Sequence, residues 1–126
     1  MYTVKTVNSF EQFIKKSRFI SYLIPIFTED DAKKVLKDIK ATHNDANHHC
    51  YCYLLGKQQA IVRFSDDKEP AQTAGSVIYH VLTKQELTNV ICVVVRYFGG
   101  IKLGAGGLVR AYSSSASQAC KTADII

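Results

Sequence analysis

RYFGGIKLGAGGLVRAY, residues 96–112, contains five of the seven glycines in this chain of 126 residues. The stretch follows a strongly apolar strand candidate at Val90–Val95 and leads into a helix candidate that begins near Gly107. Glycine lets backbone N–H groups approach a ligand without an intervening Cβ, and the free N–H groups at a helix N-terminus attract anions. Lys102 and Arg110 add positive charge, and the stretch contains no acidic residue. This part of the sequence therefore predicts a strand, an anion-binding turn and a helix.

The glycine-rich turn departs from the common nucleotide-binding motifs. It lacks the Gly-Lys-Ser/Thr end of a Walker loop, and no spacing within it reproduces GxGxxG followed by an acidic residue. Two compatible interpretations stay open: a phosphate site, or a turn whose glycines allow the helix to pack closely on the sheet. For the first, the predicted phosphate- or nucleic-acid-binding residues are Arg96, Tyr97, Gly99, Gly100, Lys102, Gly104, Gly106, Gly107 and Arg110.

Composition indicates one folded domain. Hydrophobic residues make up 47% of the chain and charged residues 21%, which argues against disorder. The formal net charge of +5 favours polyanionic partners without requiring them. No signal peptide is recognisable, and the apolar runs are too short to span a bilayer. Because the four cysteines show no disulfide pattern, we expect a protein of the reducing cytoplasm, away from membranes.

The order of predicted elements is β-α-β-β-α-β-α. Thr28 and the acidic residues after it mark the start of the first helix, whose apolar residues recur at helical spacing. The other elements are strands at Phe19–Phe27, His49–Leu55, Ala60–Phe64 and Val90–Tyr97, a further short strand near Tyr2–Val7, and helices at Ala74–Leu87 and from Gly107. This order predicts an α/β (α+β) two-layer sandwich. In it a mixed sheet of about four strands carries its helices on one face and leaves the other to solvent or a partner.

Histidines and acids between residues 48 and 69 form a candidate secondary site: His48, His49, Asp66, Asp67 and Glu69. On a strand, alternate residues share a face, so His48 would lie with Cys50 and Cys52 and apart from His49. His48, Cys50 and Cys52 on one face would offer three ligands for zinc, but no second CxxC or HxxxH pair completes a tetrahedral site. Buried cysteines and exposed imidazoles are the favoured interpretation, and no metal is predicted.

The three acids of the secondary site also allow two interpretations. Asp66, Asp67 and Glu69 could hold magnesium together with the phosphates of a ligand. The favoured alternative is a helix-start turn in which Asp66 and Glu69 form a capping box. No nucleophile elbow or cysteine signature accompanies these acids, so we predict neither catalytic residues nor a cofactor.

Four segments of the chain resemble the IMPACT/YigZ family. They are SRFISYLIPI (17–26), ANHHCYCYLLG (46–56), FSDDKEPAQTAG (64–75) and VVVRYFGGIKLGAGGLVRAYSSSAS (93–117), and the resemblance covers about residues 17–122. It implies the N-terminal domain of the family, with a ribosomal protein S5 domain 2-like fold.

The resemblance also implies a domain organisation and a role. Eukaryotic members regulate translation during amino-acid starvation, a stress response, by competing for an activator of the initiation-factor kinase, helped by an additional RWD domain. Bacterial members usually carry a C-terminal ferredoxin-like domain proposed to bind nucleic acid. We expect residues 1–126 to be a single domain of the N-terminal type, with the C-terminal domain absent.

The sequence departs from the family pattern in the acidic turn. The usual DDGEPSGTAG is DDKEPAQTAG, with Lys68, Ala71 and Gln72 where Gly, Ser and Gly are typical. Asn47 stands where Thr is usual before the two histidines. Side chains at two flexible positions weaken the case for a functional acidic turn, whereas the glycine-rich motif is intact.

The leading functional hypothesis is a non-enzymatic binding module that acts on translation. It would contact RNA, the ribosome or a ribosome-associated protein through the glycine-rich loop. In this hypothesis Lys102 and Arg110 neutralise one phosphate, and Tyr97 or Phe98 stacks on an unpaired base.

Two other function classes stay open. One is an enzyme acting on a phosphorylated or nucleotide-like small molecule, with magnesium on Asp66 and Asp67 and a proton carried by His48 or His49. The other is a protein–protein adaptor that docks an acidic regulatory partner on the basic helix face formed by Lys33, Lys34, Lys37 and Lys40.

Overall fold

β5 (Val90–Tyr97) forms the centre of the fold in the computed structural model, which describes all of residues 1–126. Its residues from Val90 to Val95 are fully buried, as an unbroken apolar run requires when both faces of a strand are covered. The other elements, in chain order, are β1 (Asn8–Ile14), β2 (Ser17–Pro25), α1 (Glu29–Thr42), β3 (His48–Leu55), a 3-10 turn (Lys57–Gln59), β4 (Ile61–Ser65), α2 (Gly75–Lys84) and α3 (Gly104–Lys121).

The five strands pair in the order β1-β2-β5-β3-β4, and every pair is antiparallel. The predicted α+β class is confirmed, but a mixed sheet of about four strands is wrong. A mixed sheet would arise if the two strands joined by α1 were neighbours, because a β-α-β unit produces parallel strands. Instead β5 lies between β2 and β3 and is antiparallel to both.

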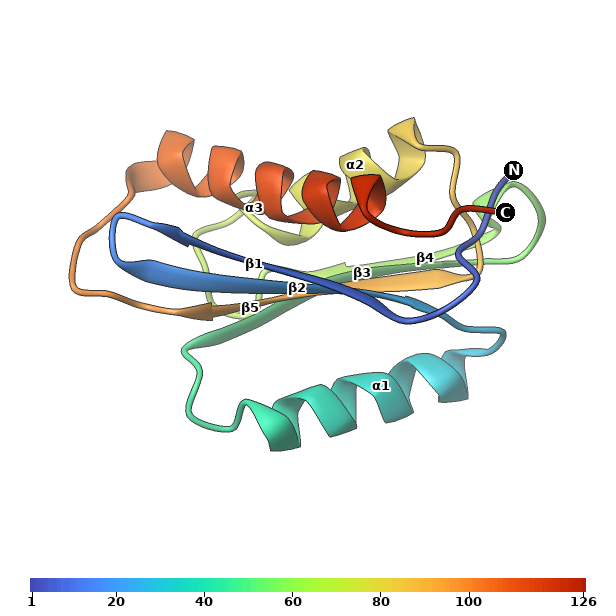
Figure 1. Cartoon of the computed structure of the whole chain (residues 1–126), viewed down its shortest axis with the longest axis horizontal. Helices are drawn as coiled ribbons and strands as arrows, with labels where there is room; N and C mark the ends of the chain where they lie inside the picture. Colours follow the sequence, from blue (N-terminus) through green and yellow to red (C-terminus); the bar gives the residue numbers. More distant parts are fainter.

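Helices cover both faces of the sheet, so the prediction of helices on one face is also wrong (Figure 1). α2 and α3 lie over the main core, a cluster of 20 buried residues. α1 lies on the opposite face, where Ala32 and Ile39 belong to a second cluster of 9 buried residues. The residues of β5 alternate between the two clusters, so its continuous apolar run needs a covering layer on each side.

The first strand is β1, whereas the segment Tyr2–Val7 forms only isolated bridges. In β1 the half-buried positions alternate between polar and apolar residues, so the sequence lacks the apolar alternation that would predict a strand. Asn8 donates a hydrogen bond to the Ala119 carbonyl of α3, and Gln12 donates to Ser115 Oγ at 2.8 Å. These polar groups are satisfied by α3, so only the folded chain shows why they face inward.

The helices begin and end near the predicted positions. Thr28 caps α1, as expected, and the structure adds a capping box between Thr28 and Asp31. α3 begins at Gly104 rather than near Gly107, although glycine costs a helix about 1 kcal/mol relative to alanine. Burial of Leu103 and Leu108 on either side of this first turn holds it in place. None of the helices is both long enough and apolar enough to cross a bilayer.

All four cysteines are buried and unpaired, which confirms that they belong to the core. Cys52 and Cys92 are cross-strand partners beneath α2 and α3. Burial raises the pKa of Cys52 to about 12 and that of Cys120 to about 11. These thiols therefore stay protonated at physiological pH.

Candidate functional site

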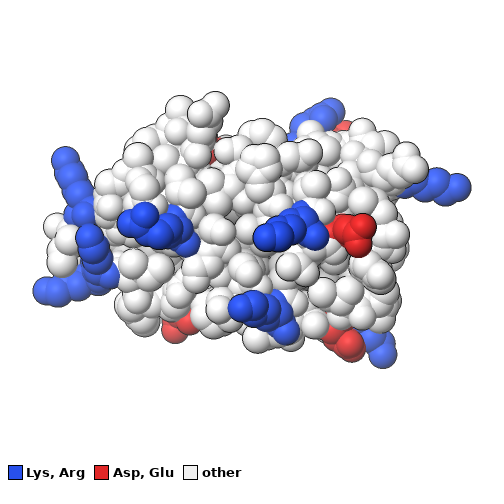
Figure 2. All heavy atoms as spheres, turned by 90° about the horizontal axis from the view of Figure 1, so that it is seen from above, with Lys and Arg blue, Asp and Glu red and all other residues white.

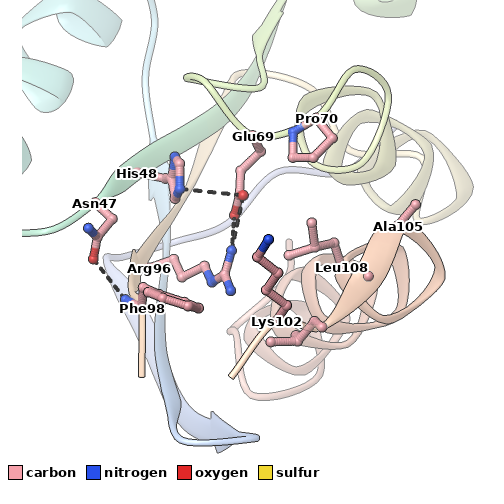
Figure 3. Close-up of a pocket in the computed structure, with 11 residues that line it drawn as sticks. Asn47, His48, Glu69, Pro70, Arg96, Phe98, Lys102, Ala105 and Leu108 are labelled. Atoms are coloured by element: carbon pink, nitrogen blue, oxygen red, sulfur yellow. Dashed lines mark hydrogen bonds and ion pairs between the residues drawn. The ribbon is translucent and has the colours of Figure 1, made fainter. Parts of the chain in front are cut away.

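A cavity of about 410 Å³ opens where β5 ends, β3 begins and α3 starts (Figure 3). It brings together members of both predicted sites: Arg96, Lys102 and Gly104 of the first, and His48 and Glu69 of the second. The complete lining is Asn47, His48, Glu69, Pro70, Arg96, Phe98, Lys102, Leu103, Gly104, Ala105 and Leu108.

A buried ion pair between Arg96 and Glu69 lies at the centre of this cavity. Arg96 Nη1 donates to Glu69 Oε1 at 3.0 Å and to Oε2 at 2.9 Å, and the two side chains are only 6% and 3% exposed. The Nε and Nη2 groups of Arg96 both donate to Ser17 Oγ at 3.3 Å. The guanidinium carbon lies 5.7 Å from the ring centre of Phe19 and 5.4 Å from that of Phe98. Arg96 is therefore a positioned part of the cavity wall.

Tyr112 and Cys50 support the ion pair from the core. The Tyr112 hydroxyl donates to Glu69 Oε2 at 2.5 Å, and Cys50 Sγ lies 3.4 Å from the Tyr112 hydroxyl oxygen. Burial raises the pKa of both the phenol and the thiol, so both remain hydrogen-bond donors at physiological pH. Glu69 is thus held as an acceptor for Arg96 and Tyr112 together.

His48 lies at the side of the cavity with its ring orientation determined by the backbone. Its Nδ1 lies 2.8 Å from the Asp67 carbonyl oxygen, which can only accept, so the hydrogen-bond network assigns the hydrogen to Nδ1. Its Nε2 lies 3.4 Å from Glu69 Oε1 (Figure 3). His48 therefore presents Nε2, and not Nδ1, to Glu69 in the cavity.

Asp66 and Asp67 do not line the cavity, because their carboxylates bind backbone N–H groups. Asp66 accepts from three backbone N–H groups at 2.8–3.1 Å around the start of α2, and Asp67 accepts from the His49 N–H at 2.6 Å. The helix-start interpretation is therefore confirmed for Asp66. The capping box is wrong, because the Glu69 carboxylate pairs with the buried guanidinium of Arg96 instead.

The acidic turn keeps a backbone shape that suits glycine. Lys68 and Gln72 have φ angles of 71° and 65°, in the left-handed region. These are the two positions at which the family pattern has glycine. Lys68 and Gln72 therefore have a backbone conformation that is unfavourable for residues with a Cβ. The hydrogen bonds of Asp66 and Asp67 maintain this conformation.

Lys68→Gly is expected to raise the free energy of unfolding by about 1 kcal/mol, because the left-handed region costs a residue with a Cβ about that much. Urea denaturation measures the change. Lys57→Gly is the matched control, since Lys57 is also exposed in a turn but has no positive φ. A Lys68→Gly variant that is less stable than the starting protein would contradict this account.

The first turn of α3 separates the two cations that were expected to share a phosphate. Lys102 lines the 410 Å³ cavity, whereas Arg110 lines a second hollow of about 300 Å³ together with Lys15. Leu103 is the one residue that borders both. Neither Lys102 nor Arg110 forms an ion pair with a carboxylate. The structure therefore does not bring them to one point.

The remaining glycines of the motif occupy different positions. Gly107 borders the second hollow, and Gly100 and Gly106 border neither. Gly99 packs against the backbone of Lys16 in the turn between β1 and β2. The motif thus combines the packing interpretation, at Gly99, with residues that line the cavity.

Tyr97 and His49 lie on the α1 face, on the other side of the sheet from the cavity. The Nε2 and Nδ1 atoms of His43 each lie 2.6 Å from a hydroxyl, of Tyr22 and Tyr97 respectively, and His49 Nε2 lies 2.8 Å from the His43 carbonyl oxygen. Burial lowers the pKa of His43, so its ring is neutral at pH 7. Of the two aromatic residues expected to stack on a base, only Phe98 borders the cavity.

Three residues that shape the cavity were not recognised in the sequence. Asn47 accepts a hydrogen bond from the Phe98 N–H at 2.8 Å, Ser17 binds Arg96, and Tyr112 binds Glu69. Each is a single polar group with no spacing pattern. The available signal was Arg96 itself, because an arginine that ends a buried strand needs a carboxylate partner.

Sequence comparison connects the chain with a known family. Residues 15–120 match the family model described as the Impact N-terminal domain. The chain is similar to the IMPACT family member YvyE of Bacillus subtilis, with 46% identity over 93% of this chain and 54% of YvyE. It spans about half the length of the curated relatives it matches.

Solved structures agree with this assignment. A crystal structure of a hypothetical protein superposes with a TM-score of 0.93 and 38% identity, covering 99% of this chain and 62% of that chain. The two-domain translational regulator Yih1 superposes with a TM-score of 0.53 and 23% identity over 97% of this chain and 47% of that chain, a likeness of fold. By the extent of the family match and the identity to its members, the chain belongs to the IMPACT family, and residues 15–120 correspond to the family's N-terminal domain.

Proposed function

We propose that this chain is a non-enzymatic RNA-binding module that regulates translation in the cytoplasm, contacting ribosomal or other RNA through the cavity at the start of α3. Yih1, which shares its fold, is described as a translational regulator. The observation that carries the proposal is the charge balance of the cavity. Its lining contains two cations, Lys102 and Arg96, and a single carboxylate, Glu69, which is paired with Arg96, so the charge of Lys102 is not balanced within the cavity.

The cavity offers complementary groups for a nucleotide. Lys102 is exposed and has no carboxylate partner, so its charge is free for a phosphate. Gly104 and Ala105 line the wall at the start of α3, where no side chain caps the helix. Unpaired N–H groups and the helix dipole favour an anion there. Phe98 is 46% exposed and provides a face on which an unpaired base stacks.

Lys102→Ala is expected to weaken binding of a short single-stranded RNA about fivefold at 0.1 M salt, because one phosphate contact releases about 0.7 counterion. The slope of log affinity against log salt concentration should fall by about 0.7 for the same reason. Fluorescence anisotropy at several salt concentrations measures both. Lys34→Ala is the matched control, since it removes the same charge from exposed α1 on the far face.

The proposal fails if the unaltered protein does not bind RNA. It also fails at this site if Lys102→Ala and Lys34→Ala have the same affinity and the same salt dependence. Weaker binding by Lys102→Ala, but not by Lys34→Ala, would support the cavity as the RNA contact.

One observation favours a second candidate function, an enzyme that acts on a nucleotide-like small molecule. His48 has its ring held by the Asp67 carbonyl and presents Nε2 toward Glu69 in the cavity. Asp66 and Asp67 bind backbone N–H groups instead, so we assign no magnesium to them. A thermal-shift screen separates the candidates. Stabilisation by one nucleotide that disappears in His48→Ala supports the enzyme, whereas equal stabilisation by many polyanions supports RNA binding.

A further inference from the structure

Two lysines form the turn between β1 and β2 in a strained conformation. Lys15 and Lys16 separate the two strands and have φ angles of 47° and 67°. Two-residue hairpin turns with positive φ at both positions strongly favour pairs such as Asn-Gly, because left-handed backbone is unfavourable for other residues. Strained residues that a fold retains are concentrated at functional sites. This turn therefore keeps two lysines where its backbone favours other residues.

The strained turn is held against the glycine-rich loop. A Cβ added to Gly99 would lie 1.9 Å from the Lys16 carbonyl oxygen, so the two backbones are in direct contact. The Gly99 N–H also donates to Ser17 Oγ at 3.3 Å, and the same oxygen accepts a hydrogen bond from Arg96. The two lysines thus have a defined position relative to the cavity.

Lys15 and Arg110 share the second hollow, with the Ser114 hydroxyl beside them. Neither of these cations, nor Lys16, forms an ion pair with a carboxylate of the chain. Figure 2 shows Lys and Arg side chains gathered at one end of the face that carries α2 and α3. This end of the protein therefore presents positive charge that has no partner within the fold.

We infer that a bound RNA strand extends beyond the cavity, across the first turn of α3, with a second phosphate held by Lys15, Lys16 and Arg110. This inference rests on the proposed function. The two hollows lie on either side of the same helical turn and meet at Leu103. A small phosphorylated molecule would occupy one hollow, whereas an RNA strand presents successive phosphates to both.

The double substitution Lys15→Asn with Lys16→Gly tests the inference, because it installs the residues that such a turn favours. Its unfolding midpoint should rise by about 4 °C or more as the strain is relieved. Its affinity for single-stranded RNA should fall about fivefold at 0.1 M salt, because the contact with the second phosphate is lost at about 0.7 counterion. Opposite changes in stability and binding exclude loss of folding as the cause.

The control is Lys33→Ala with Lys37→Ala, which removes the same charge from exposed positions of α1 and should leave RNA affinity unchanged. The inference is overturned if the turn variant binds RNA like the unaltered protein, or if the control loses as much affinity. In either case weaker binding by Lys102→Ala would leave the proposed function standing. Absence of RNA binding by the unaltered protein would overturn both.

Discussion

Glu69→Ala is expected to lower the free energy of unfolding by about 3–5 kcal/mol, because it leaves the buried guanidinium of Arg96 without its countercharge. Arg96 and Glu69 are 6% and 3% exposed, so little of the guanidinium is open to water that could replace the lost carboxylate. The Tyr112 hydroxyl also loses its acceptor. Urea denaturation followed by circular dichroism measures the loss.

A second variant tests the same account if Glu69→Ala does not fold. Glu69→Leu combined with Arg96→Met replaces the ion pair by apolar side chains and should recover most of the lost stability, because no charge stays buried. Glu11→Ala is the control, since Glu11 pairs with Arg18 at the exposed surface. Its effect on the free energy of unfolding should lie within the error of the measurement. A Glu69→Ala variant as stable as Glu11→Ala would contradict a buried pair.

Gly99→Ala is expected to cost about 3 kcal/mol or more, equivalent to a fall of about 10 °C in the unfolding midpoint, because overpacking here involves backbone. The added Cβ would lie 1.9 Å from the carbonyl oxygen of Lys16 and 2.1 Å from its carbonyl carbon. The β1–β2 turn would have to separate from the loop that follows β5. Thermal unfolding measures the effect.

Gly106→Ala is the matched control within the same motif. An added Cβ there would meet only Arg110 Nη1, at 3.5 Å, and Gly106 is exposed in the first turn of α3. Because alanine is the better helix former, this variant should gain about 0.5–1 kcal/mol. Equal effects of the two substitutions would show that Gly99 does not approach the turn as closely as described.

Different residues of the glycine-rich motif have different roles. Gly99 allows the loop to contact the β1–β2 turn, and Leu103 to Ala105 form part of the cavity wall. Sequence analysis predicted one phosphate between Lys102 and Arg110, whereas the structure places these side chains in two hollows. Their separation is what leads to the inference of an extended RNA strand.

Part of the candidate site could be recognised from the sequence. Arg96, Lys102 and Gly104 belong to a contiguous motif, and all three line the cavity. Tyr97 belongs to the same motif but faces α1, because successive residues of a strand point to opposite faces. The sequence does not show which helices cover which face of the sheet. It therefore could not show on which face the cavity lies.

The sequence by itself determined the α+β class, the family, the capped start of α1 and the buried central strand. These features depend on short-range patterns: a cap acts within one helical turn, and the apolar run of six residues at 90–95 indicates burial wherever it lies. Only the tertiary structure decided the sheet order, the covering of both faces and the partner of Arg96. Those depend on contacts between distant segments, such as Glu69 with Arg96, 27 residues apart, and Gly99 with Ser17, 82 residues apart. A buried charge needs a partner of opposite charge, and a glycine without a Cβ allows another segment to approach closely. Which residue takes that place depends on how the whole chain packs.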